Sequence, residues 1–175
     1  IKIKVMVNFK RSTNSIKGYT HSEIAKKEKN DCFVRALASA TGVDYDTSHK
    51  FSKDYFGRKD KKGVYFTSGT IEPLEKDGLD IGNKSFDFKV LGKGRVTNAY
   101  KLYGEMVYRQ KTVKSFIKDN PKGTFIVGVS GHAFTIQDGT LIDNADEKFR
   151  PTRKVTSVFQ LKSKRSEGKQ LSLFA

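Results

Sequence analysis

The stretch DCFVRALASATG, residues 31–42, decides the first buried element of the fold. Asp31 is a residue type that commonly precedes the first turn of a helix, and Gly42 is the type that commonly follows the last turn. The residues between them are rich in alanine and leucine, so the stretch predicts a buried helix over residues 32–41. Cys32 would then begin this helix, where free amide groups and the helix dipole favour a thiolate, the nucleophilic form of cysteine.

Further elements are expected on both sides of this helix. The apolar residues of segment 1–9 alternate, which predicts a half-buried strand, and the polar stretch 11–30 is expected to wrap the surface. Segment 92–110 carries glycines and tyrosines without a clear period, which indicates a loop. The remaining expected elements are helices over 45–56, 71–78 and 112–120, the last capped by Thr112, and strands over 86–91, 124–130 and 155–161.

The segment HAFTIQDGTLIDN, residues 132–144, predicts a hairpin. Two extended runs meet at Asp138-Gly139, a dipeptide that strongly favours two-residue hairpin turns. Directly opposed residues share a sheet face, and so do alternate residues along a strand. With the turn centred on this dipeptide, Asp143 lies on the same face as His132 and one diagonal step away.

Cys32, His132 and Asp143 would together form the thiol version of a nucleophile, base and orienting-group arrangement. Asn144 is the alternative orienting group, since a bulge or an odd-length turn would exchange the two sheet faces. Each residue also has an ordinary interpretation. A lone cysteine is often a small buried apolar residue, a strand histidine is often a satisfied polar residue, and Asp-Asn at a strand end often only makes a turn.

Two blocks, NDCFVRALASATG at residues 30–42 and KGTFIVGVSGHAFTIQDGTLIDN at residues 122–144, resemble the papain-like cysteine peptidase superfamily. The likeness is to small phage and bacterial members with DCxxRAxAxATG and GHxxxxxDGxxxD motifs. It implies an α+β fold in which the cysteine helix packs against an antiparallel sheet that carries the histidine and the aspartate. It also implies a cysteine hydrolase acting through a thioester on a protein or peptide substrate, with amidase and acyltransferase as alternatives. By this resemblance Cys32 is the nucleophile, His132 the base and Asp143 the orienting residue.

One departure from the family pattern concerns the oxyanion. Many papain-like enzymes carry a glutamine shortly before the nucleophile, and residues 25–32 contain none. Asn30 could donate instead, together with the backbone amide of Cys32, or it could be only a turn residue. Losing one oxyanion donor typically costs about 100- to 1000-fold in rate, so activity would otherwise be weak or absent. Arg35 could support the thiolate or bind an acidic substrate, but a structural ion pair is the favoured interpretation.

Composition bounds the remaining possibilities. In 175 residues there are 34 lysines and arginines against 19 acidic residues, a net charge of +15 that favours an anionic partner. We expect one domain over residues 1–161 and a basic tail over 162–175. No run approaches the roughly 20 apolar residues of a membrane span, and the first residues lack the apolar core of a signal peptide. One cysteine forms no internal disulfide, which favours a reducing interior. The resemblance to phage and bacterial proteins implies the cytoplasm of a bacterial host, with delivery in a virion as an alternative.

The charge supports a second hypothesis, a nucleic-acid-associated protein on a catalytically silent papain-like scaffold. Basic residues with tyrosines among them could hold phosphates while the rings stack on bases. We expect no cofactor and no metal, because three histidines and one cysteine lack metal-ligand spacing. His21 and His49 are expected at the surface. The basic residues form two groups, at positions 26, 27, 29, 50, 53, 58, 59, 61 and 62 and at positions 150, 153, 154, 162, 164, 165 and 169.

Overall fold

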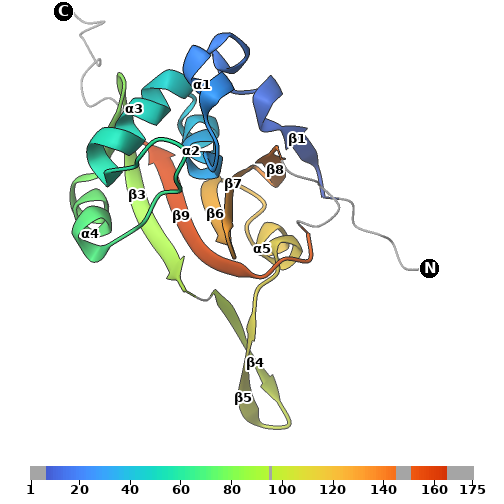
Figure 1. The fold of residues 1–175 in the computed structure, drawn as a ribbon. Helices are drawn as coiled ribbons and strands as arrows, with labels where there is room; N and C mark the ends of the chain where they lie inside the picture. The colour runs from blue at the N-terminus through green and yellow to red at the C-terminus, as the bar shows by residue number, and fades with distance from the viewer. Residues whose placement is uncertain (1–6, 95, 145–150, 165–175) are drawn as a thin grey trace, which may run out of the picture.

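The computed structural model of the chain describes residues 7–94, 96–144 and 151–164, and Figure 1 displays a large sheet with helices around it. The helices are η1 (Ser12–Asn14), η2 (Tyr19–His21), α1 (Glu23–Lys27), α2 (Cys32–Thr41), α3 (Tyr45–Phe56), α4 (Ser68–Asp77) and α5 (Val113–Asp119). The strands are β1 (Phe9–Arg11), β2 (Leu79–Ile81), β3 (Lys84–Lys93), β4 (Thr97–Leu102), β5 (Glu105–Gln110), β6 (Thr124–Val129), β7 (His132–Gln137), β8 (Thr140–Asp143) and β9 (Val155–Ser163).

Seven strands form the main sheet, in the order β1-β8-β7-β6-β9-β3-β2, and β4 pairs only with β5 in a separate hairpin. Neighbouring strands of the main sheet are antiparallel except β1 and β8. Helix α2 packs on β7 and β6 near the middle of this sheet. The expected combination of helices with a mostly antiparallel sheet is confirmed.

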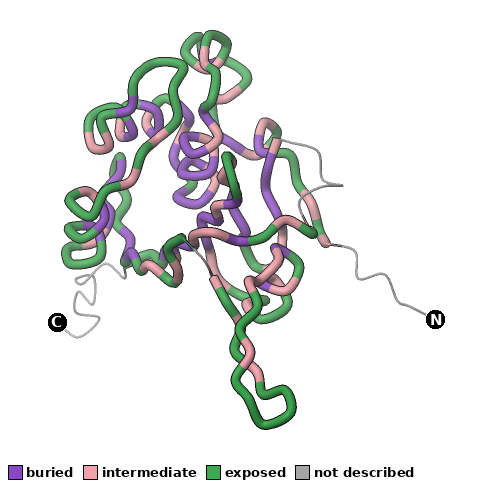
Figure 2. Tube along the Cα trace, turned by 60° about the horizontal axis from the view of Figure 1, so that its bottom comes forward, coloured by how far each residue is buried: buried purple, intermediate pink, exposed green. Residues whose placement is uncertain are grey.

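The core lies on both faces of the sheet. On one face Leu37 of α2 packs in a cluster with Ile126 of β6. On the other face Phe116 of α5 packs on Phe125 of β6, with 5.1 Å between the ring centroids. Successive side chains of a strand point to opposite faces, so neighbouring residues of β6 serve the two clusters. Figure 2 shows buried residues concentrated in α2 and the strands beneath it, which hold this helix firmly against the sheet.

The helices that the sequence predicts at residues 32–41 and 45–56 are confirmed with these bounds. Gly42 follows α2 with a φ of 71°, in the left-handed region where glycine carries no steric penalty. The helix after Thr112 is also confirmed, and the Thr112 hydroxyl accepts a hydrogen bond from the backbone N–H of Ser115 (3.2 Å). The short helix α4 and the strands β3, β6 and β9 lie where they were expected.

Two expectations about the middle of the chain are wrong or incomplete. Residues 92–110 are not a loop: the end of β3 and the hairpin β4–β5 occupy most of them. Tyr103 and Gly104 make the hairpin turn with φ values of 50° and 84°, the signature of a type I′ turn. The hairpin β4–β5 has no buried face, so its sequence lacks the alternation of apolar and polar residues that identifies strands. The short strand β2 was also not predicted from the sequence.

The ends of the chain differ from expectation in detail. Most of the strand expected over residues 1–9 lies outside the described residues, and β1, which begins at Phe9, pairs in parallel with β8 at the edge of the main sheet. The polar stretch 11–30 contains η1, η2 and α1. Strand β9 continues past residue 161 to Ser163, and the rest of the expected tail, 165–175, lies outside the described residues. Within the described ranges, no helix is long and apolar enough to cross a membrane.

Candidate active site

Cys32 is the first residue of α2 and its side chain is partly buried. Asp31 occupies the N-cap position, but its side chain does not cap the helix. Its carboxylate instead accepts a hydrogen bond from the Tyr45 hydroxyl (2.7 Å between Oδ2 and Oη) and pairs with Arg35 (3.2 Å between Oδ1 and Nη2). The expected position of Asp31 before the first turn is therefore confirmed, while a buried hydroxyl and a guanidinium take the carboxylate that would otherwise cap the helix. The first amides of α2 stay available beside the thiol.

His132 and Asp143 meet as the hairpin register predicts. Gln137 lies opposite Thr140 in the β7–β8 pair, so the turn is centred on Asp138-Gly139. The two carboxylate oxygens of Asp143 lie 2.8 and 2.9 Å from Nε2 of His132. Asp143 is only 4% exposed, so this hydrogen bond is protected from water. The other ring nitrogen, Nδ1, remains for a second partner.

Asn144 takes a different role. Its backbone carbonyl accepts a hydrogen bond from the Arg11 guanidinium (3.1 Å), and its side-chain oxygen accepts one from the backbone N–H of Thr13 (3.3 Å). Its own backbone N–H donates to Asp143 (2.7 Å). Asn144 therefore fastens the chain around β1 to the end of β8. The alternative in which it orients His132 is wrong, since the hairpin has no bulge that would exchange the faces.

A hydrogen bond between distant segments fixes α2 relative to β7. The hydroxyl of Thr135, fully buried, donates to the carbonyl of Ala36 (2.7 Å). Thr135 lies three residues after His132, and Ala36 lies one turn after Cys32, so this bond aligns the thiol with the imidazole. The sequence contains no signal for this contact beyond a polar residue between two apolar ones, Phe134 and Ile136, in the middle of the strand.

The protonation equilibria of the two groups are shifted in opposite directions. Burial raises the pKa of the Cys32 thiol, but hydrogen bonds from the His132 ring and the Ala133 backbone N–H, and the charges of His132 and Arg35, outweigh burial and lower this pKa below its ordinary value. Burial lowers the pKa of His132, yet Asp143 and Cys32 raise it to about 9. Together these shifts favour a thiolate paired with an imidazolium over a neutral thiol beside a neutral imidazole.

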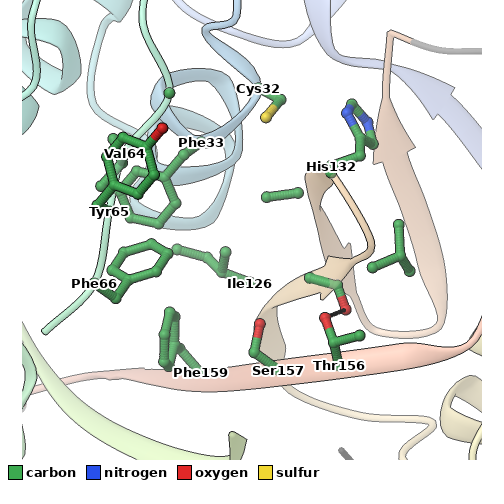
Figure 3. Close-up of a pocket in the computed structure, with 15 residues that line it drawn as sticks. Cys32, Phe33, Val64, Tyr65, Phe66, Ile126, His132, Thr156, Ser157 and Phe159 are labelled. Carbon is green, nitrogen blue, oxygen red and sulfur yellow. Dashed lines mark hydrogen bonds between the residues drawn. The ribbon is translucent and has the colours of Figure 1, made fainter. Parts of the chain in front are cut away.

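Cys32 and His132 lie at one end of a pocket of about 280 Å³ (Figure 3). Most of the opposite wall is aromatic. The ring of Phe66 makes edge-to-face contacts with Phe33 (4.9 Å between centroids) and Phe159 (5.2 Å). Such contacts hold the rings in place, so the pocket offers a preformed apolar surface beside the thiol. The other labelled lining residues are Val64, Tyr65, Ile126, Thr156 and Ser157.

Asn30 and Arg35, the expected auxiliary residues, have structural partners. Asn30 has a φ of 52°, its side-chain amide donates to the carbonyl of Lys61 (3.0 Å), and it does not line the pocket. The structure therefore favours a turn residue over an oxyanion donor. Arg35 forms the expected ion pair, with Asp31, while its charge also contributes to the lowered pKa of Cys32.

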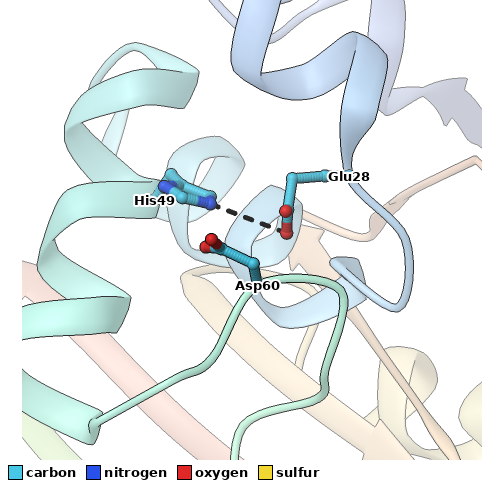
Figure 4. Close-up of side chains that lie close together, drawn as sticks. All are labelled: Glu28, His49 and Asp60. Carbon is cyan, nitrogen blue, oxygen red and sulfur yellow. Dashed lines mark ion pairs between the residues drawn. The ribbon is translucent and has the colours of Figure 1, made fainter.

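A second polar cluster joins the segment that precedes Cys32 to α3 and to the loop that follows α3. Glu28, His49 and Asp60 offer ligand atoms within 4.8 Å of one another (Figure 4). The side chain of Arg58 is fully buried, pairs with Glu28 and lies 3.3 Å from Nε2 of His49. This guanidinium already supplies the positive charge, so the cluster does not suit a metal ion. His49 is 5% exposed, so its expected surface position is wrong, whereas His21 is exposed as expected.

Comparisons of the chain with protein-family models, with curated proteins and with solved structures found no significant match. The resemblance stated for the two sequence blocks therefore has no support from a relative. What the chain can do has to be argued from the geometry of its own residues.

Proposed function

We propose that the chain is a cysteine hydrolase of papain-like arrangement that cleaves peptide bonds. One observation carries the proposal: the buried carboxylate of Asp143 holds His132, and His132 lines the same pocket as Cys32 and lowers the pKa of this thiol at the start of a helix. The opposite pKa shifts fit a nucleophile and its base. The packing of α2 on a mostly antiparallel sheet that carries the histidine and the aspartate supports the papain-like part of the proposal.

In the proposed reaction the thiolate of Cys32 attacks the acyl carbon, and the carbonyl electrons move to oxygen. When the carbonyl reforms, the C–N bond breaks and the imidazolium of His132 gives its proton to the leaving amine, which leaves a thioester. His132 then takes a proton from water as the water oxygen attacks the thioester. The acid leaves, the thiolate is restored, and the imidazolium is ready for another cycle. Asp143 keeps Nε2 of His132 oriented throughout.

The oxyanion of this reaction would rely on backbone donors. Asn30 is bound to Lys61, which leaves the amide of Cys32 as the donor that the helix start provides. One donor fewer than usual costs about 100- to 1000-fold in rate, and both formation and hydrolysis of the thioester pass through an oxyanion, so we expect slow turnover.

The pocket supports a preference within the substrate class. Its aromatic wall would accept an apolar or aromatic side chain close to the scissile bond, because transfer of such a side chain from water is favourable. Peptides with aspartate or glutamate at that position would lose this gain and would bring a charge against the rings.

The proposal is tested with a library of fluorogenic peptides and with mass spectrometry of the intact protein. We expect hydrolysis of peptides with apolar residues, an acyl adduct on Cys32, and loss of both in Cys32→Ala. His132→Ala should reduce the rate, whereas His21→Ala, which changes an exposed histidine outside the site, should leave it unchanged. Transfer of the acyl group to an added amine in preference to water would redirect the assignment to an acyltransferase. The proposal fails if the wild-type protein forms no adduct with any acyl donor.

A further inference from the structure

The hairpin β4–β5, residues 97–110, which we call the arm, projects from the body of the molecule (Figure 1). Each of its strands has six residues, so the arm reaches about 20 Å. None of its residues is buried, and Figure 2 shows it exposed or intermediate along its whole length. A two-stranded hairpin with no face to pack on is marginally stable alone, which points to a role in contacting something else.

One face of the arm collects apolar side chains together with positive charge. Ala99 pairs with Tyr108, and Lys101 pairs with Met106, so these four side chains share one face. Tyr108 is 65% exposed, and Tyr103 at the turn is 98% exposed. The one carboxylate of the arm, Glu105, pairs with Leu102 on the opposite face. This face therefore presents the Tyr108 ring and a lysine without a nearby negative charge, and the Tyr103 ring is exposed at the turn that ends the arm.

The base of the arm adds two more cations. Arg109 and Lys154 line a hollow together with Tyr108 and Gln110. The side chain of Gln110 donates to the carbonyl of Val155 (2.8 Å), which fixes the base of the arm to the start of β9. Neither Arg109 nor Lys154 has an ion-pair partner within the described part of the chain. The Arg109 guanidinium lies over the ring of Tyr100 (5.5 Å from Cζ to the ring centroid), on the face of the arm opposite Tyr108. A ring leaves the N–H donors at the edge of a guanidinium available, so both cations can still meet an external anion.

We propose that the arm binds single-stranded nucleic acid. Unpaired bases would stack on the rings of Tyr103 and Tyr108, while Lys101, Arg109 and Lys154 would contact phosphates. A duplex hides its base faces and would gain only the phosphate contacts. The net charge of +15 opposes association of two copies of this chain through the arm and favours a polyanion. The proposal is independent of the hydrolase proposal, since it uses none of the residues around Cys32.

The test is fluorescence anisotropy of a labelled oligothymidylate of about 16 nucleotides with the full chain. Replacing Tyr103 or Tyr108 with alanine should weaken binding by about tenfold for each ring, and replacing them with phenylalanine should retain it. Three phosphate contacts predict a loss of affinity of about 20-fold between about 50 and 200 mM salt. The double change Arg109→Gln with Lys154→Gln should remove most of this salt dependence.

The matched control is the double change Lys27→Gln with Lys76→Gln, which removes two exposed charges on α1 and α4, away from the arm. Equal losses from the arm pair and the control pair would overturn the proposal, because they would mean binding by overall charge. Binding that survives both alanine changes would overturn it too. So would a dimer in sedimentation that Tyr103→Ala dissociates, since the arm would then bind a second copy. Unfolding curves that match the wild type would verify that the variants are folded.

Discussion

The protonation state of Cys32 offers the most direct test of the site, because it requires no substrate. Burial raises the pKa of this thiol, and His132 supplies both a hydrogen bond and a charge that lower it. In His132→Ala only the Ala133 N–H and Arg35 still oppose burial, so we expect the pKa of Cys32 to rise. An ordinary thiol, with a pKa of about 8.5, is ionised to about 3% at pH 7, so a lowered pKa can raise the ionised fraction by at most about 30-fold.

Ionisation alone therefore sets a limit of about 30-fold on the loss of reactivity. A thiolate of low pKa is intrinsically less nucleophilic, so we expect alkylation by iodoacetamide at pH 7 to slow by about 5- to 30-fold in His132→Ala. Cys32 is the only cysteine, so the mass of the intact protein reports its alkylation without interference. The wild-type rate should stay high well below the pKa of a free thiol, whereas the variant rate should rise only near or above that value. His21→Ala should behave as the wild type. A wild-type profile that follows an ordinary thiol, unaffected by His132→Ala, would refute the ion pair.

Three further changes probe the supports of the site. The rate of hydrolysis should fall as pH rises through about 9, because above the pKa of His132 the imidazole has lost the proton that the leaving amine needs. Asp143→Asn removes a cause of this raised pKa, so the fall should begin at a lower pH in a pH–rate profile. Glu28→Gln should lower the free energy of unfolding by about 3–5 kcal/mol in urea titrations, because it leaves the buried guanidinium of Arg58 unpaired. The control Asp54→Asn breaks an exposed ion pair with Lys50 and should lower the free energy of unfolding by only about 0–1 kcal/mol. Thr135→Val should lower the free energy of unfolding by about 1–2 kcal/mol, because it removes the buried hydrogen bond to the carbonyl of Ala36. It should also change kcat more than KM, since this hydrogen bond aligns α2 with His132. A variant with normal kcat would contradict this alignment role.

The hairpin that carries His132 and Asp143 could be predicted from sequence in full, including which residue faces the imidazole. Its turn dipeptide sets the register locally, and the period of two along a strand then decides the face of every residue. The start of α2 at Cys32 was equally accessible, since helix boundaries depend on neighbouring residue types. The catalytic hypothesis thus came from short segments whose geometry is decided within about ten residues.

What the sequence could not predict depends on contacts between distant segments. Asp31 looks like a helix cap, but Tyr45 of the next helix occupies its carboxylate, together with Arg35 one turn along α2. His49 carries no motif, and only the folded chain brings it against Arg58 in a buried cluster. The arm was missed for a different reason: strand prediction detects a buried face, and the arm has none.

The placement of the thiol follows from how firmly the chain before it is held. A helix start provides free amides wherever it occurs, but a nucleophile also needs a fixed distance to its base. Here Thr135 fastens α2 to the strand of His132, and Arg58 donates to the carbonyl of Lys29 (3.2 Å) while it pairs with Glu28. Buried charges are a costly way to stabilise a fold, and an apolar cluster of the same volume would often serve as well. Arg58 contacts Glu28 and Lys29, which lie just before Cys32 in the sequence. These contacts therefore hold the segment that leads into α2 in one conformation, which the proposed chemistry requires and stability alone does not.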